Sequence, residues 1–182
     1  LGEDFLMSSL FTEAEVALAN LGLAELSEPG VDVVVGGLGL GYTASTVLEH
    51  PNVRELLIVD TMREVFEWHQ QGLLPLGEQL VSDSRCRFVH GDFFAMSASR
   101  SRGFDPENRG RKHHAILLDV DHSPRNVLHL SHAPFYEPDG LRQLTSHLLP
   151  GGVFALWSND PPDEQFHAAL SKVFASHETH VV

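Results

Sequence analysis

Five short apolar runs alternate with helix-like segments along the chain, and this alternation constrains the fold more than any other feature. Such an alternation is typical of βαβ units arranged around a parallel sheet. The runs lack a strict apolar–polar alternation, as expected for strands that helices cover on both faces. The predicted fold class is therefore α/β, with strands at "VDVVVG", "ELLIVD", "CRFVHGD", "AILLDVD" and "GVFALWS".

The length and composition favour one domain. The chain has 182 residues, of which 42% are hydrophobic, and a single domain usually takes about 100–200 residues. No apolar run approaches the ~18 residues of a membrane span, and no secretory signal pattern begins the chain. We expect one domain over 1–182, with an N-terminal helix region at 1–30 and an α/β core at 31–182, in the cytoplasm.

Cysteine content and charge exclude several classes of function. The single cysteine, Cys86, excludes an intrachain disulfide and a thiolate metal cluster. The net charge of −13 would repel a nucleic-acid backbone. We expect no nucleic-acid, membrane or metal partner, and the sequence leaves a homodimer open. The chain starts at Leu1 and stops within a strand-like "HETHVV", which favours a segment truncated at both ends.

Two helix starts and one loop follow from local patterns. Thr12 with Glu15 resembles a capping box for a helix through about Leu26. Asp160 before Pro161 resembles the N-cap of a later helix. The polar stretch from Ser97 to His114 carries five of the twelve basic residues and predicts a surface loop. Such a loop is usually solvated, and the alternative is a role in gripping substrate.

The first strand ends in a glycine-rich turn, "GGLGLG" at 36–41. Glycines tolerate positive φ and carry no Cβ, so the backbone of such a turn can approach a ligand closely. The structural alternative is tight packing alone. The turn is therefore a candidate site only together with other features.

Acidic residues follow the next two strands. Asp60 comes about twenty residues after the glycines, where a carboxylate can accept hydrogen bonds from ribose hydroxyls. Asp92 ends the third strand and could accept a bond from an adenine amino group, the alternative being a helix cap. Both positions belong to the carboxyl edge of a parallel sheet.

These segments resemble a known family. "GGLGLG", "LLIVDTMREVFEW", "HGDFF", "ILLDVDHSP" and "FYEPDGLRQLTSHLLPGGVFALW", in this order, are similar to the spermidine synthase (aminopropyltransferase) family. The resemblance implies a Rossmann-like class I methyltransferase fold with a mostly parallel seven-stranded sheet. It also implies S-adenosylmethionine or decarboxylated S-adenosylmethionine as co-substrate. The implied cofactor-binding residues are Gly37, Gly39, Gly41, Asp60, Thr61, Gly91, Asp92 and Phe93.

The acceptor side departs from the family pattern. The aspartate that the family's glycine turn typically carries, and that meets the amino end of decarboxylated S-adenosylmethionine, is replaced by Leu40. "LMSS" at 6–9 stands where the family has a Tyr-His-Glu-like element. In "DVDHSP" the first acid of the family motif is kept as Asp119, but His122 occupies the second acidic position.

The strand end "LLDVDHSP" holds the candidate catalytic residues Asp119, Asp121 and His122. Transfer to a primary amine needs a proton acceptor, because an amine of pKa ~10 arrives protonated at neutral pH. Asp119 and Asp121 lie two apart on an extended segment and should share a side. The alternatives are a loop-ordering role for Asp119 and solvated side chains for the other two. Phe135, Tyr136 and Trp157 are expected in the core rather than in a substrate cage.

Three functions are compatible with these residues. The first is a spermidine synthase-like transferase that alkylates a small, cationic acceptor such as an amine, as in polyamine biosynthesis. The second is a small-molecule methyltransferase, which Leu40 favours. The third is a non-catalytic nucleoside-binding homologue.

Overall fold

The computed structural model describes residues 10, 12–120 and 123–182, which form an α/β structure with one parallel sheet. The sheet order is β3-β2-β1-β4-β5, and all four pairings are parallel. The strands are β1 (Val31–Gly36), β2 (Val53–Asp60), β3 (Cys86–His90), β4 (His113–Leu118) and β5 (Leu148–Leu156).

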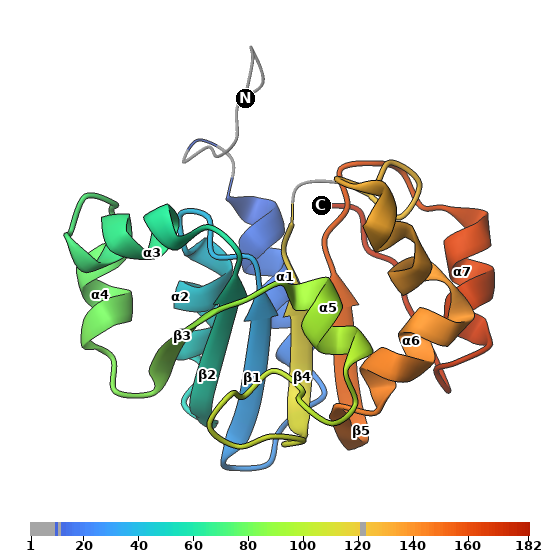
Figure 1. Cartoon of the computed structure of the whole chain (residues 1–182), viewed down its shortest axis with the longest axis horizontal. Helices are drawn as coiled ribbons and strands as arrows, with labels where there is room; N and C mark the ends of the chain where they lie inside the picture. Colours follow the sequence, from blue (N-terminus) through green and yellow to red (C-terminus); the bar gives the residue numbers. More distant parts are fainter. Residues whose placement is uncertain (1–9, 11, 121–122) are drawn as a thin grey trace.

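Helices cover both faces of the sheet, as predicted from the near-continuous apolar strands (Figure 1). One face packs against α1 (Glu13–Leu23), α2 (Tyr42–Glu49), α3 (Arg63–Gln70) and α4 (Gly77–Ser82). The other packs against α5 (Phe93–Ala98), the 3-10 helix η1 (Leu130–Tyr136), α6 (Pro138–Thr145) and α7 (Glu164–Ser171).

The predicted elements are largely confirmed, with three differences. The described residues form five of the seven strands expected of the complete fold. Thr12 precedes α1, but its side chain makes no capping hydrogen bond, so the capping box is not formed. The N-cap of α7 is Asp163 rather than Asp160; its Oδ1 accepts from the amide of Phe166 at 2.8 Å. No helix in the described part of the chain is long and apolar enough to cross a membrane.

The aromatic residues near the end of the chain belong to the core, as expected. Phe135 and Tyr136 are 6% and 8% exposed, and burial raises the pKa of Tyr136 to about 12. Trp157 packs against the core cluster on the opposite face of the sheet.

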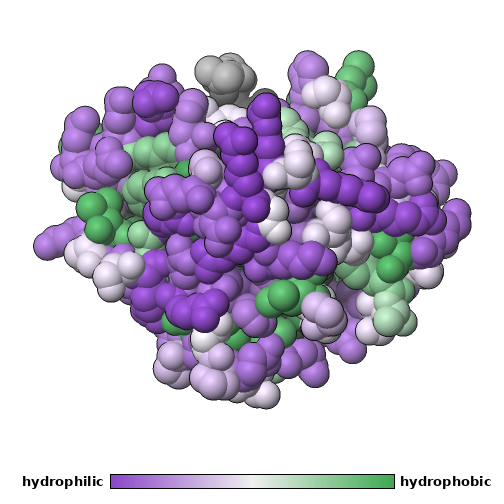
Figure 2. All heavy atoms as spheres, turned by 60° about the horizontal axis from the view of Figure 1, so that its bottom comes forward, coloured by the Kyte–Doolittle hydropathy of each residue, from purple (hydrophilic) through white to green (hydrophobic). Residues whose placement is uncertain are grey.

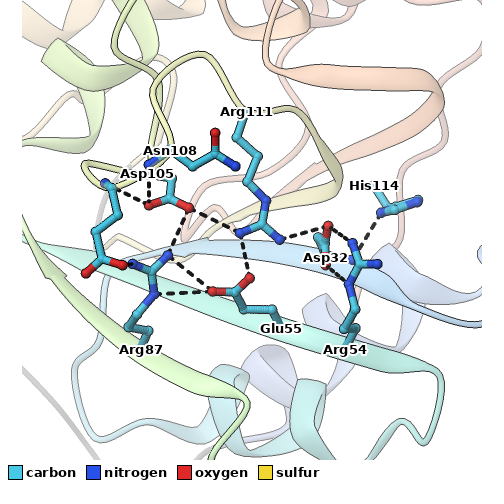
Figure 3. A network of polar contacts seen from close by, with 9 residues as sticks. Asp32, Arg54, Glu55, Arg87, Asp105, Asn108, Arg111 and His114 are labelled. Atoms are coloured by element: carbon cyan, nitrogen blue, oxygen red, sulfur yellow. Dashed lines mark hydrogen bonds and ion pairs between the residues drawn. The ribbon is translucent and has the colours of Figure 1, made fainter.

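Ion pairs join residues at the amino ends of the strands, at the bottom of the Figure 1 view (Figure 3). Hydrophilic residues cover most of this face of the molecule (Figure 2). Arg111, from the polar loop before β4, contacts Glu55 at 2.5 Å, Asp32 at 3.0 Å and Asp105 at 3.1 Å. Asp32 also pairs with Arg54, and Asp105 with Arg87. Burial raises the pKa of both aspartates, but the arginine hydrogen bonds outweigh it and the net pKa is lowered.

This network changes the interpretation of the polar loop. Phe104 and Asp105, in its middle, are 0% and 2% exposed, so the loop is anchored rather than simply solvated. Arg111 lies at the amino edge of the sheet, whereas the glycine turn follows the carboxyl end of β1. Arg111 is therefore engaged in ion pairs at the edge opposite the glycine turn, and a role of the loop in gripping substrate stays a prediction.

At the carboxyl edge, the chain after β1 is packed directly against the end of β4. The amide of Asp119 donates to the carbonyl of Gly36 at 2.7 Å, and the amide of Gly37 donates to Val59 at 2.8 Å. Gly37 has a φ of +98°, and a Cβ at this position would overlap the carbonyl oxygen of Asp119. A side chain at residue 37 is thus excluded by both backbone conformation and space.

We expect Arg111→Met to destabilise the fold by about 2 kcal/mol. The loss should stay below the ~3–5 kcal/mol of a wholly orphaned buried charge, because Asp32 keeps Arg54 and Asp105 keeps Arg87. Urea unfolding at neutral pH measures the loss of stability. The control is Arg109→Met, because Arg109 is an exposed arginine in the same loop. The pKa values of Asp32 and Asp105 are lowered in the folded state, so their ion pairs with Arg111 stabilise the fold only while both carboxylates are charged. The stability difference between wild type and Arg111→Met should therefore shrink below about pH 4. Equal stability of the two variants would contradict the anchoring role.

We expect Gly37→Ala to cost more stability than Gly72→Ala. Both glycines have positive φ, +98° and +68°, so each alanine incurs backbone strain on the order of 1–3 kcal/mol. Only at Gly37 does the added Cβ also meet another chain segment, because nothing lies within 4 Å of a Cβ at Gly72. Matched urea unfolding curves followed by circular dichroism measure the difference. Equal losses of stability in the two variants would show that the chain at Asp119 can shift to make room for the Cβ at no cost in free energy.

Candidate functional site

The glycine turn is a β-turn that joins β1 to α2. The carbonyl of Leu38 accepts from the amide of Gly41 at 2.8 Å, which places Gly39 and Leu40 at the two central positions. Gly37, Gly39 and Gly41 have φ of +98°, +48° and +91°. All three therefore occupy the left-handed region that the sequence predicted for them.

At two of these glycines, Gly37 and Gly41, other atoms of the protein occupy the space that a Cβ would need. At Gly37 the neighbour is the carbonyl of Asp119, and at Gly41 a Cβ would lie 2.5 Å from Cδ1 of Leu80 and 3.2 Å from Cε1 of His69. The expected close approach is thus made by the chain itself at both positions. Contact of the turn with a ligand stays a prediction.

Asp60, the last residue of β2, is tied to the turn through its carboxylate. Oδ2 accepts from the amide of Leu38 at 2.8 Å, and Oδ1 accepts from the amide of Met62 at 2.8 Å. A carboxylate offers about four acceptor sites, so these two bonds leave capacity for hydroxyl donors. Asp60 therefore shapes the turn and can also accept from a ribose.

The third strand end combines helix capping with core packing. Asp92 is the N-cap of α5, and its Oδ1 accepts from the amides of Phe94 and Ala95 at 2.9 and 3.2 Å. The capping role that the sequence left open is therefore present, and both bonds go to one oxygen. Phe93 is 4% exposed, and its ring occupies the space that a Cβ at Gly36 would need. The ring also stacks on that of Phe104, with the two ring centroids 4.9 Å apart.

The remaining two candidates at this edge contribute backbone contacts. The carbonyl of Thr61 accepts a hydrogen bond from Nε2 of His90 at 3.1 Å, and the amide of Gly91 donates to the carbonyl of Asp60 at 3.0 Å. These bonds join the ends of β2 and β3. The roles of Thr61, Gly91, Asp92 and Phe93 toward a cofactor stay predictions.

Asp119 follows β4 and lies beside the glycine turn. Its Oδ2 accepts from Oγ1 of Thr43 at 2.6 Å, and Thr43, in α2, is 2% exposed. A buried hydroxyl on one oxygen limits rotation of the carboxylate, so Asp119 is held in one orientation. Asp121 and His122 lie outside the described residues, and their catalytic roles stay predictions.

A set of polar contacts, which the sequence did not indicate, joins the loop after β4 to the loop after β5. Asp160 accepts hydrogen bonds from the hydroxyl of Ser123 and from the side-chain amide of Asn126, the second at 2.6 Å. Arg125 pairs with Asp163 at 2.6 Å. The bond from Ser123, followed by that from Asn126, lowers the pKa of Asp160. The two loops at this edge are thus fastened to each other.

No family model matches the chain. The polyamine aminopropyltransferase 2 of Pseudomonas aeruginosa is 30% identical over 151 residues, which are 80% of this chain and 39% of that protein. The chain thus spans well under half the length of this curated relative.

Two solved structures show the same fold. A spermidine synthase in complex with the transition state analogue AdoDATO superimposes with a TM-score of 0.65 at 20% identity, covering 88% of this chain and 51% of the synthase. Human methyltransferase-like protein 13 in complex with SAH gives a TM-score of 0.50 at 24% identity, covering 79% of this chain and 60% of that protein. These comparisons confirm the resemblance and the fold: the chain is similar in sequence to a polyamine aminopropyltransferase and shares its fold with a spermidine synthase and a class I methyltransferase.

Proposed function

We propose that the chain is the nucleoside-binding part of a transferase that takes S-adenosylmethionine or its decarboxylated form and alkylates a small amine. The observation that carries this proposal is the Asp60 carboxylate, which lies at the end of β2 and is hydrogen-bonded to the glycine turn. The similarity to a polyamine aminopropyltransferase supports the transferase class. The analogue AdoDATO in the similar synthase supports an adenosyl ligand.

The proposed chemistry asks little of the protein. A sulfonium carries a good neutral leaving group, so the site mainly aligns nucleophile, carbon and sulfur and excludes water. The amine must also lose a proton. Asp119 is the proposed acceptor among the described residues, because the bond from Thr43 orients its carboxylate beside the turn.

Leu40 favours a second candidate, a small-molecule methyltransferase. It occupies a central position of the glycine turn and offers no carboxylate to the amino end of a decarboxylated ligand. Calorimetry against S-adenosylmethionine, its decarboxylated form and methylthioadenosine distinguishes the two. Preference for S-adenosylmethionine would favour methyl transfer, and turnover of putrescine with the decarboxylated form would favour aminopropyl transfer. Tight binding without turnover of any acceptor would leave only the non-catalytic homologue.

We expect Asp60→Ala to weaken S-adenosylmethionine binding by about 10- to 150-fold, since a hydrogen bond to a charged group contributes about 1.5–3 kcal/mol. Calorimetry on the folded variant measures the dissociation constant. Asp92→Asn should lose less affinity than Asp60→Ala, because the side-chain amide oxygen of asparagine can still accept a hydrogen bond from an adenine amino group. Asp139→Ala, an exposed carboxylate on α6, is the control. An unchanged constant for Asp60→Ala would remove this residue from the site.

We expect Asp119→Asn to slow transfer by about 10²–10⁴-fold with nearly unchanged cofactor affinity, because it removes a positioned base. Single-turnover kinetics with saturating cofactor measures the step, scanning putrescine, longer polyamines and methyl acceptors. Thr43→Val keeps the carboxylate but removes its orienting bond, together with the longer contact of the Thr43 hydroxyl with the carbonyl of Glu15 at 3.4 Å, so the transfer rate should fall less than in Asp119→Asn. Asp121→Asn provides the comparison along the same strand end. A wild-type rate in Asp119→Asn would exclude this carboxylate as the base.

A further inference from the structure

His69 lies on the buried face of α3, one turn after Val65 and Phe66. Its side chain is 1% exposed, and its ring meets the edge of Phe88 with centroids 6.1 Å apart. Nε2 lies 3.0 Å from the carbonyl oxygen of Gly39, at a central position of the glycine turn. A histidine from a different element therefore contacts the most conformationally free part of the turn.

The partner of Nε2 determines the protonation of the ring. A carbonyl can only accept, so Nε2 must carry the proton and donate it. Nδ1 is then unprotonated in the neutral ring, and it is buried with no hydrogen-bond partner among the described residues. A second proton at Nδ1 would place an unpaired charge in the core. Burial accordingly lowers the pKa of His69, partly offset by the Gly39 bond and the charge of Asp60.

The hydrogen bond from His69 also sets the direction of a neighbouring amide. The peptide between Gly39 and Leu40 is planar and trans, so the N–H of Leu40 points opposite to the carbonyl of Gly39. Rotating this central peptide converts one turn type into another, and a glycine permits that rotation at little steric cost. With the carbonyl held toward α3, the Leu40 amide is held facing away from it.

The turn is thus held from two sides. Asp60 accepts from the amide of Leu38, before the central peptide, and His69 donates to the carbonyl of Gly39, within it. We propose that His69 is a positioning residue: it holds the glycine turn in one conformation and thereby raises the affinity of the chain for an adenosyl ligand. The affinity part of this inference rests on the function proposed above.

Calorimetry with S-adenosylhomocysteine tests the effect on binding. His69→Phe keeps an aromatic ring but removes the donor, and should bind about tenfold more weakly, which corresponds to ~1.4 kcal/mol. His69→Gln restores a donor and should recover part of the affinity. Val65→Ala, on the same buried face of α3, is the matched control: it should lower the melting temperature with affinity within about twofold of wild type. Equal affinities of His69→Phe and wild type, or equal losses in His69→Phe and Val65→Ala, would overturn the proposal.

Nitrogen-15 spectra of the His69 ring test the contact without any ligand. We expect the Nε2–H tautomer at neutral pH. Hydrogen exchange of the Gly41 amide should be faster in His69→Phe than in Val65→Ala, with His69→Gln between the two. An Nδ1–H tautomer would overturn the contact, even if His69→Phe fails to fold. If the wild type binds no adenosyl ligand while the tautomer is as expected, the proposed function fails and only the turn-holding role of His69 stands.

Discussion

The candidate site depends on the contact between Gly37 and the carbonyl of Asp119. Because residue 37 has no side chain and a positive φ, the end of β4 can lie directly against the chain leaving β1. This contact brings the Asp119 carboxylate next to α2, where Thr43 holds it. Thr43, which follows the glycine turn in α2, is 76 residues from Asp119 in the sequence. The glycine turn and the candidate base are thus brought together by a packing requirement.

The two edges of the sheet have separate roles. At the amino edge, arginines and carboxylates satisfy one another and anchor the loop before β4. At the carboxyl edge, the polar groups instead fix loops relative to each other: Asp60 to Leu38, and Asp160 to Ser123 and Asn126. The proposed function is therefore assigned to the carboxyl edge, and substitutions in the ion-pair network at the amino edge should leave its chemistry unchanged.

The proposed transferase relies on preorganised backbone as well as on the carboxylates of Asp60 and Asp119. Leu40 removes one carboxylate from the turn, and the turn is instead held by Asp60 and by His69. In the proposed function, this arrangement makes ligand affinity depend on the direction of backbone groups in the turn. It also explains why a buried histidine distant in sequence from the glycines bears on the same proposed ligand.

The sequence alone determined the parallel α/β fold and the five strands, and it indicated that the glycines of the turn can take positive φ, because strand periodicity and the conformational freedom of glycine are local properties of a segment. It also placed Asp60 and Asp92 at the correct edge. Only the tertiary structure decided which groups these residues meet. The ion pair of the buried Asp105 with Arg87, the bonds of Asp160 with Ser123 and Asn126, and the contact of His69 with Gly39 all depend on partners distant in the sequence. Local pattern does not encode such contacts, because hydrogen-bond partners are chosen by how the elements pack.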